Sequence, residues 1–217
     1  MMIFSKSIDF LRPDWSFCRV ALVFFVLSVW FFGVVPCDAA RFNTVVIDAG
    51  HGGRDRGAVW GGVRESHLNL AVARDLEALL KQRGIRTVMT RRSDVFVSIQ
   101  RRAQIANAQR HAVVVSIHFN ASTNTSVHGA ETFYWSGNGR ILANAIQRRL
   151  APRLQVRNRG IHRKGYTLIM QTRHPTVLVE CGFISNPRER RRCVTRWYQQ
   201  TAARAIFDGL MAYRTLR

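Results

Sequence analysis

Apolar and polar positions along the chain follow two periods, and they predict a regular succession of strands and helices. Runs rich in apolar, β-branched residues predict buried strands, at 44–48, 85–90, 113–118, 130–135, 166–170 and 176–180. Apolar residues three or four positions apart predict amphipathic helices, at 66–83, 98–110, 139–154 and 195–213, with a short helical segment from Pro187. This alternation predicts an α/β fold, in which helices flank both faces of a mixed, mainly parallel sheet.

The first forty residues have a different pattern. An uncharged apolar run covers 20–35, and three basic residues precede it. Such a run, followed by small residues, predicts a secretory signal that is cleaved near Ala39 or Ala40, with a retained short membrane anchor as the alternative. We therefore expect 1–40 to be a signal peptide or short anchor and 41–217 to be one folded domain, exported to the periplasm or the cell envelope.

The formal net charge is +20, from 33 basic and 13 acidic residues. Residues 1–40 contain equal numbers of each, so the charge belongs to the folded part. It favours an anionic partner, such as an anionic envelope surface bound through a basic face, although solvated helix faces explain it equally well. A nucleic-acid partner is not expected, because the arginines are scattered, the leader indicates export, and no nucleic-acid-binding motif occurs.

A glycine-rich loop and a pair of cysteines narrow the class of protein further. The loop at 49–64 contains six glycines, but their spacing fits neither a P-loop nor a dinucleotide-binding fingerprint. They let the backbone approach a metal or substrate closely.

After the leader, the only cysteines are Cys181 and Cys193. Export permits a disulfide between them, but the spacing alone does not establish its geometry, and two separate buried thiols are the alternative.

Four side chains that are distant in the sequence are predicted to meet in space. His51, His118 and Glu180 each close an apolar strand, and Glu65 lies just ahead of a helix. Ligands bind at the carboxyl ends of strands in such sheets, where two imidazoles and a carboxylate make a three-ligand zinc site. A second carboxylate in an apolar setting suits a general base. His67 is the best alternative ligand, because it lies two residues from Glu65.

These residues lie in motifs that resemble the zinc-dependent N-acetylmuramoyl-L-alanine amidases of the amidase-3 type. The resemblance extends over about 43–213, and its blocks occur in the family's order: VVIDAGHGG at 45–53, Glu65 before a helix, SIHFN at 116–120, and VLVECGFISN at 177–186. The chain departs from the family pattern at Ala49, where a proline is usual. The short stretch at 135–160 also leaves little room for the inserted helix with which some members block their site.

The resemblance implies that His51, Glu65 and His118 hold Zn²⁺ and that Glu180 is catalytic. It implies cleavage of the amide between N-acetylmuramic acid and L-alanine of the peptidoglycan stem peptide, with Glu180 as general base and acid on a zinc-bound water. Asn120 and the glycine loop are expected to line the substrate groove of a monomer, which an unidentified protein activator could control. A zinc carboxypeptidase acting on the stem peptide and a non-catalytic wall-binding protein are the alternatives.

Overall fold

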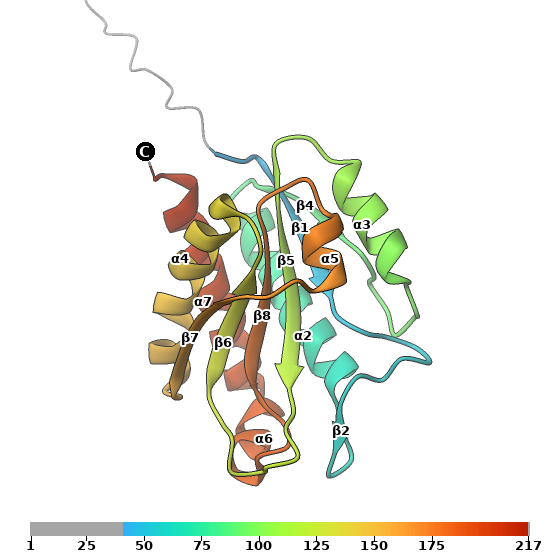
Figure 1. The fold of residues 1–217 in the computed structure, drawn as a ribbon, viewed down its shortest axis with the longest axis vertical. Helices are drawn as coiled ribbons and strands as arrows, with labels where there is room; N and C mark the ends of the chain where they lie inside the picture. The colour runs from blue at the N-terminus through green and yellow to red at the C-terminus, as the bar shows by residue number, and fades with distance from the viewer. Residues whose placement is uncertain (1–40, 217) are drawn as a thin grey trace, which may run out of the picture. The chain divides into compact units, whose positions relative to one another are not determined.

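The computed structural model describes residues 41–216, so the predicted leader lies outside the described residues. No helix in the described part is long and apolar enough to cross a membrane. A six-stranded sheet forms the centre of the fold (Figure 1). Its strands, in spatial order, are β4 (Arg86–Met89), β1 (Thr44–Ala49), β5 (Ala112–Asn120), β8 (Thr176–Phe183), β6 (Ala130–Tyr134) and β7 (Asn158–Arg163).

The sheet is mixed and mainly parallel, as predicted. Strands β4, β1, β5 and β8 run parallel to one another, β6 pairs antiparallel with β8, and β7 pairs parallel with β6. The carboxyl ends of β1, β5 and β8 consequently lie at one edge of the sheet. This edge is where residues that follow buried parallel strands meet.

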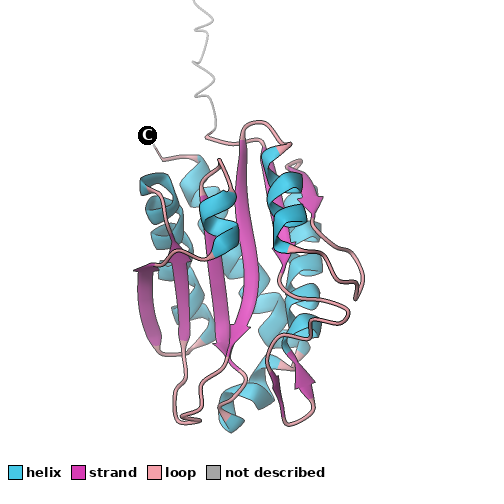
Figure 2. Ribbon diagram, turned by 45° about the vertical axis from the view of Figure 1, so that its right-hand side comes forward, coloured by secondary structure: helices cyan, strands magenta, loops and turns pink. Residues whose placement is uncertain are grey.

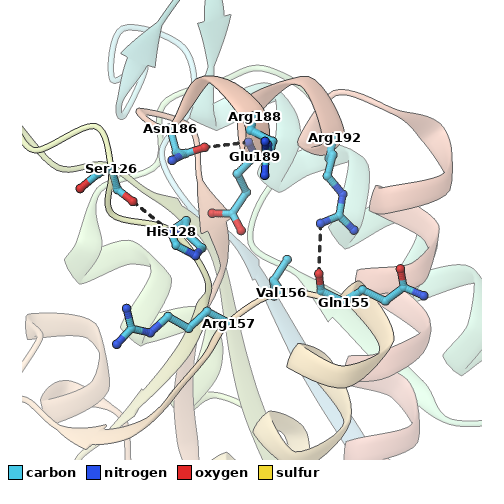
Figure 3. Close-up of a pocket in the computed structure, with 9 residues that line it drawn as sticks. All are labelled: Ser126, His128, Gln155, Val156, Arg157, Asn186, Arg188, Glu189 and Arg192. Carbon is cyan, nitrogen blue, oxygen red and sulfur yellow. Dashed lines mark hydrogen bonds between the residues drawn. The ribbon is translucent and has the colours of Figure 1, made fainter.

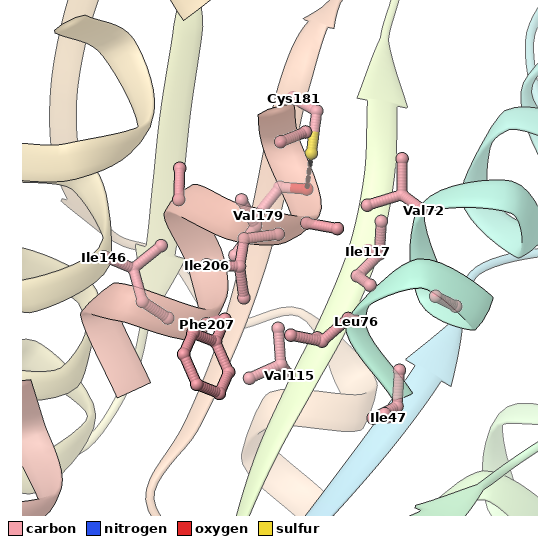
Figure 4. Packing of buried hydrophobic residues seen from close by; sticks show 14 of the residues in the cluster. Ile47, Val72, Leu76, Val115, Ile117, Ile146, Val179, Cys181, Ile206 and Phe207 are labelled. Atoms are coloured by element: carbon pink, nitrogen blue, oxygen red, sulfur yellow. Dashed lines mark hydrogen bonds between the residues drawn. The ribbon is translucent and has the colours of Figure 1, made fainter. Parts of the chain in front are cut away.

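Helices cover both faces of the sheet (Figure 2). The helices on one face are α2 (Glu65–Gln82), α4 (Gly137–Leu154) and α7 (Arg196–Arg214), and those on the other are α3 (Ile99–Asn107) and α5 (Thr167–Gln171). Side chains alternate across β8: Val179 and Cys181 face the three long helices (Figure 4), whereas Leu178 packs on the face covered by α5. Burial of apolar surface on both faces stabilises this three-layer arrangement.

The prediction of a strand at 166–170 is wrong, because this segment contains α5. Leu168 and Ile169 are buried, and Ile169 packs on Leu178 and Phe133 of the sheet, so packing against the sheet overrides the β-propensity of the local sequence. The sixth strand is instead β7, which was not predicted. Its residues are mostly polar and none of them is buried, because it is an edge strand, and edge strands carry polar and charged residues.

Two smaller elements complete the fold near the carboxyl edge. A hairpin of β2 (Val59–Trp60) and β3 (Val63–Arg64) lies within the glycine loop and leads directly into α2. Helix α6 (Pro187–Cys193) follows β8, with Asn186 as its N-cap. The hairpin was not predicted, but it brings the first residue of α2 beside the end of β1.

Candidate active site

Three side chains with metal-binding atoms meet at the carboxyl edge of the sheet. His51 follows β1, Glu65 begins α2, and His118 lies on β5. One ligand atom from each lies within 4.8 Å of the others. Glu65 Oε1 is 3.3 Å from His51 Nε2 and 2.8 Å from His118 Nδ1. The structure therefore brings together three of the four residues that were predicted to meet.

The charges and donor atoms of this cluster are those of a metal site. Burial raises the pKa of Glu65, but contacts with His118 and His51 outweigh burial and hold it below its ordinary value. Burial lowers the pKa of His51, yet Glu65 and then Asp55 raise it to about 9. A carboxylate with a lowered pKa supplies the negative charge that a divalent cation draws from its ligands, and metal binding requires the imidazole nitrogens to be free of protons. Two nitrogens and one carboxylate are a donor set that fits Zn²⁺.

His51 has a strained backbone, with φ at 58°, which is uncommon for a residue other than glycine. Buried Arg102 donates from Nη2 to the His51 carbonyl at 2.7 Å, and buried Arg91 donates to the Gly50 carbonyl at 2.9 Å. The Asp55 carboxylate lies 2.9 Å from His51 Nδ1, which orients the ring and leaves Nε2 for the cluster. The surrounding protein therefore fixes both the backbone and the ring of His51.

The His118 ring packs directly against Gly50, which has no side chain. A Cβ at position 50 would overlap ring atoms Cε1 and Nε2. We expect Gly50→Ala to displace this ring and weaken zinc binding by about 10- to 100-fold, as changes around metal ligands do. Competition with a chromogenic chelator measures the affinity. Gly137→Ala is the matched control, since a Cβ there meets nothing within 4 Å. Equal zinc affinity of the two variants would contradict this role of Gly50.

Glu180 lies on β8, beside His118 of β5 on one side and Glu131 of β6 on the other. Its Oε2 atom is buried and has no hydrogen-bond partner among the described residues. Burial, followed by the charges of Glu65 and Glu131, raises the pKa of Glu180 well above its ordinary value, and Lys164 opposes this effect. A buried polar atom without a partner is costly, and a carboxyl with a raised pKa suits proton transfer.

One cavity of about 780 Å³ contains all four of the predicted site residues. Asn120 also lines it, as expected. The rest of its wall is largely apolar, with Phe96 and Val97 from the loop before α3, Ile99 from the first position of α3, and Leu168 from α5. The cavity therefore combines a polar centre, capable of metal-assisted hydrolysis, with a wall that can contact apolar parts of a substrate.

Known proteins share both the sequence and the fold of this chain. The family model for N-acetylmuramoyl-L-alanine amidase matches residues 45–212. The chain belongs to this amidase family.

Two relatives from Bacillus subtilis (strain 168) match most of the amidase. The uncharacterized protein YqiI is 40% identical, covering 83% of this chain and 91% of YqiI. The N-acetylmuramoyl-L-alanine amidase LytC is 36% identical over 79% of this chain but only 35% of LytC, so the amidase spans about a third of that protein.

Solved structures agree with these matches. The catalytic domain of the amidase CwlV from Bacillus (Paenibacillus) polymyxa var. colistinus superposes with a TM-score of 0.78 at 35% identity, covering 81% of this chain and all of that domain. The CwlD amidase from Clostridioides difficile, in complex with the GerS lipoprotein, gives 0.75 at 30% identity, covering 79% and 98%. The predicted family, enzyme class and fold class are therefore confirmed.

Several groups that shape the amidase site were not predicted from sequence. Arg91 and Arg102 were interpreted as part of a scattered basic surface, but both are buried. Glu131 is also buried and accepts a hydrogen bond from Asn120 at 2.9 Å, while Arg159 Nε lies 3.2 Å from it. The available signal was the position of Glu131, which lies within a predicted strand between Ala130 and Thr132.

Asp48 anchors the site from inside the sheet. Its carboxylate pairs with Arg102 at 2.7 Å and accepts hydrogen bonds from the hydroxyl groups of Thr90 and Ser116 at 2.7 and 2.6 Å. Burial raises the pKa of Asp48, but Arg102 and the hydroxyl groups outweigh burial and bring it below its ordinary value. Asp48 therefore stays ionised and holds the arginine that binds the His51 carbonyl.

We expect Asp48→Asn to lower the free energy of unfolding by about 3–5 kcal/mol, because the charge of Arg102 stays buried without its partner. The folded pKa of Asp48 lies below its unfolded value. The contribution of the ionised Asp48 to the free energy of unfolding is therefore complete above about pH 4. It is lost as the pH falls through the pKa of Asp48 in the folded protein. Urea unfolding of chelated protein at neutral pH and below about pH 4 checks both points. If the native protein and Asp48→Asn differ in free energy of unfolding by the same amount at both pH values, this role of Asp48 is contradicted.

The remaining candidate groups lie outside the cluster. His67, the alternative ligand, has a side chain that is 54% exposed and pairs with Asp94 at 3.3 Å. Cys181 and Cys193 are both free and buried, which agrees with two separate thiols rather than a disulfide. Cys181 faces the long helices, on the opposite side of β8 from the cavity, so it has no place among the site residues.

A second hollow, of about 500 Å³, lies beside α6 and the end of α4 (Figure 3). Glu189 is its most buried charged residue, and its carboxylate accepts hydrogen bonds from the backbone of Gly129 and Phe183, the latter at 2.7 Å. These bonds tie the loop before β6 to the end of β8. Glu189 therefore has a structural role, and none of the predicted site residues lines this hollow.

Proposed function

We propose that the amidase hydrolyses the amide bond between N-acetylmuramic acid and the L-alanine of the peptidoglycan stem peptide, with Zn²⁺ held by His51, Glu65 and His118. One observation carries the proposal: the unpartnered Oε2 of Glu180 shares a cavity with this three-donor cluster. A wall-binding protein without catalysis does not need a buried acid that lacks a partner.

The chain's own residues have distinct parts in this reaction. Zn²⁺ at the cluster would lower the pKa of a water molecule and polarise the scissile carbonyl. Glu180 accepts a proton at Oε2 from the attacking water and delivers it to the amino group of the departing L-alanine. Asp55 orients the His51 ring, and Arg102 fixes its backbone. The apolar wall limits the access of bulk water to the reacting groups.

Mass spectrometry of muropeptides incubated with the purified chain tests this function. Zinc-dependent release of an intact peptide that begins with L-alanine, abolished by a chelator, is the expected result. Release of a single terminal amino acid would instead identify a zinc carboxypeptidase, the second candidate, which the same donor cluster supports. If zinc is bound but nothing is cleaved, a binding protein or a missing activator replaces the proposal.

We also propose that 1–40 direct export, as a cleaved signal or short anchor, and that 41–217 act as a monomeric catalytic domain in the periplasm or cell envelope. The basic residues would bind anionic envelope surfaces. The CwlD amidase is in complex with the GerS lipoprotein, and by analogy we propose that a protein partner acts as an activator of this chain. The mass of the exported protein distinguishes cleavage near Ala39 or Ala40 from a retained anchor.

A further inference from the structure

The edge of the sheet opposite the catalytic cavity is strongly basic. The amino ends of β4, β1, β5 and β8 form it, together with the ends of β6, α2 and α7 and the start of α4 (Figure 1). No acidic residue occurs in the segments at this edge, which are 41–43, 81–87, 107–112, 135–141, 171–176 and 212–216. They carry six exposed arginines, which we call the amino-edge arginines: Arg41, Arg83, Arg86, Arg110, Arg140 and Arg173.

The amino-edge arginines keep their positive charge. The ion pairs formed within 41–216 include none of them. Arg41 and Arg86 donate hydrogen bonds to a backbone carbonyl and to a side-chain amide, and both of these acceptors are uncharged. Glu77, near the end of α2, is already paired with Arg92 and with Lys81. The charge of this edge is therefore available to an anionic partner.

Hydrogen bonds join the loops of this edge into one surface. The Asn43 amide donates to the His111 carbonyl at 3.0 Å, which connects the loops before β1 and β5. The Arg173 amide donates to Oδ1 of Asn107 at 2.8 Å, which connects the loop before β8 to the end of α3. The fold thus holds like charges side by side, and such an array suits a partner that spreads anionic charge over an area.

Exposed apolar side chains lie among these charges. Trp135 follows β6 at this edge and is 41% exposed. Ile141 and Leu216 are also exposed and line one hollow of the surface. Tryptophan is enriched where proteins meet the membrane–water interface, and surfaces that combine basic with apolar side chains bind anionic lipid. The mixture therefore favours a lipid surface over a soluble polyanion.

The described chain begins at this same edge. The Arg41 amide donates to the Arg214 carbonyl at 3.5 Å, so the start of the domain lies beside the end of α7. Five residues of the sequence separate Arg41 from the apolar run at 20–35, and five residues span less than about 20 Å. If that run stays in the membrane as an anchor, the amino edge is the part of the domain next to the lipid.

We propose that the amino-edge arginines and Trp135 bind an anionic phospholipid bilayer and hold the catalytic cavity on the side of the domain that faces away from it. This inference names the surface and the partner for the proposed binding to the cell envelope, and it rests on the proposed export of the chain. A cavity on the far edge reaches material beyond the membrane rather than the head groups of that membrane.

Vesicle sedimentation of residues 41–217 tests the inference. These residues form a compact unit with its own sheet and core, and the CwlV domain that superposes on them was solved as a catalytic domain. The vesicles contain phosphatidylcholine with or without phosphatidylglycerol. The edge variant combines Arg83→Gln, Arg110→Gln and Arg173→Gln, whose side chains are all exposed.

Three arginines at the opposite edge of the sheet provide a control with the same change of net charge. Arg157, Arg188 and Arg191 are exposed. Arg157 directly precedes β7, and the other two lie on α6, across the hollow shown in Figure 3. The control variant replaces all three by glutamine. Neither variant changes a residue of the catalytic cavity.

We expect the native domain to bind only the vesicles that contain phosphatidylglycerol, and to bind them more weakly in high salt. The edge variant should bind them about 100-fold more weakly, because each basic residue near an anionic surface contributes about fivefold. The control variant should bind nearly as the native domain does, since its changes lie far beyond the Debye length of about 10 Å from the amino edge.

Four results would overturn the inference. They are native binding by the edge variant, an equal loss in both variants, equal binding to vesicles without phosphatidylglycerol, and release of the domain from vesicles by soluble polyphosphate at the same phosphate concentration. The second result would show that net charge alone attracts the domain. The fourth would assign the edge to an anionic polymer instead of a bilayer.

Tryptophan fluorescence tests the orientation independently of these variants. Trp60→Phe with Trp197→Phe leaves Trp135 as the single tryptophan of 41–217, whereas Trp60→Phe with Trp135→Phe leaves Trp197. Trp197 is 52% exposed near the start of α7, at the far end of this helix from the amino edge. Brominated acyl chains in the vesicles should quench Trp135 and not Trp197. Quenching of Trp197 alone would overturn the proposed orientation.

Turnover of soluble muropeptides by the native domain and the edge variant is measured in parallel. Equal turnover is expected, because the cavity lies at the other edge. If vesicle binding depends on the amino-edge arginines but no muropeptide is cleaved, the proposed function fails while the membrane-binding surface stands. If muropeptides are cleaved but vesicle binding does not depend on these arginines, the membrane-binding surface fails while the proposed function stands.

Discussion

Replacing Glu180 by alanine is expected to lower kcat by about 10²- to 10⁴-fold, which is the usual contribution of a general acid–base group. Zinc should stay bound, because Glu180 is not one of the three clustered donors. Removing a buried carboxyl whose Oε2 has no partner also leaves no new polar group unsatisfied, so the fold should survive. Initial rates of peptide release and elemental analysis of zinc measure the two effects on the same sample.

Glu180→Gln is the matched control, since it keeps the shape of the side chain and removes only its ability to accept the proton. It should be as inactive as the alanine variant. If both variants keep full activity, Glu180 is not the general base. If zinc is lost together with activity, Glu180 supports the metal rather than the proton transfer.

His118→Ala should eliminate stoichiometric zinc binding and, with it, turnover. The change leaves two donors, His51 and Glu65, where a catalytic zinc site needs three protein ligands. It also leaves the buried Glu65 carboxylate without its closest contact, the Nδ1 atom at 2.8 Å. Elemental analysis after dialysis should therefore find almost no zinc on the variant.

His67→Ala controls for the loss of a histidine near the site. Its ring is exposed and pairs with Asp94, outside the cluster, so this variant should keep native zinc content and activity. Unchanged zinc in His118→Ala would remove that residue from the ligand set. Loss of zinc from His67→Ala would show that the structure assigns the wrong histidine.

The donors of the cluster could be predicted from sequence because of a general property of parallel sheets. An apolar run identifies a buried strand, and residues at the carboxyl ends of neighbouring strands meet at one edge. His51, His118 and Glu180 each end or follow such a run. Glu65 was predicted from its position just ahead of a helix. The β2–β3 hairpin, which places Glu65 beside the other donors, was not predicted.

The groups that hold these donors in place could not be predicted in this way. The guanidinium groups of Arg91 and Arg102 are bound by backbone carbonyls at the end of β1, at positions that exist only after β1, β4 and α3 have packed together. Nothing in the local sequence distinguishes these two from the other arginines of a strongly basic chain. The edge strand β7 and helix α5 were missed for a related reason, since contacts with the sheet decide both.

The groups that meet at the site are far apart in the sequence, and this affects when the enzyme becomes active. Arg102 is 51 positions along the chain from the carbonyl of His51 that it binds, and His118 is 53 positions from Glu65. A nascent or unfolded chain therefore has no assembled hydrolytic centre, however much zinc surrounds it. Folding of the domain is itself the activating step, so a chain that crosses a membrane unfolded carries its hydrolytic capacity in latent form until it folds on the far side.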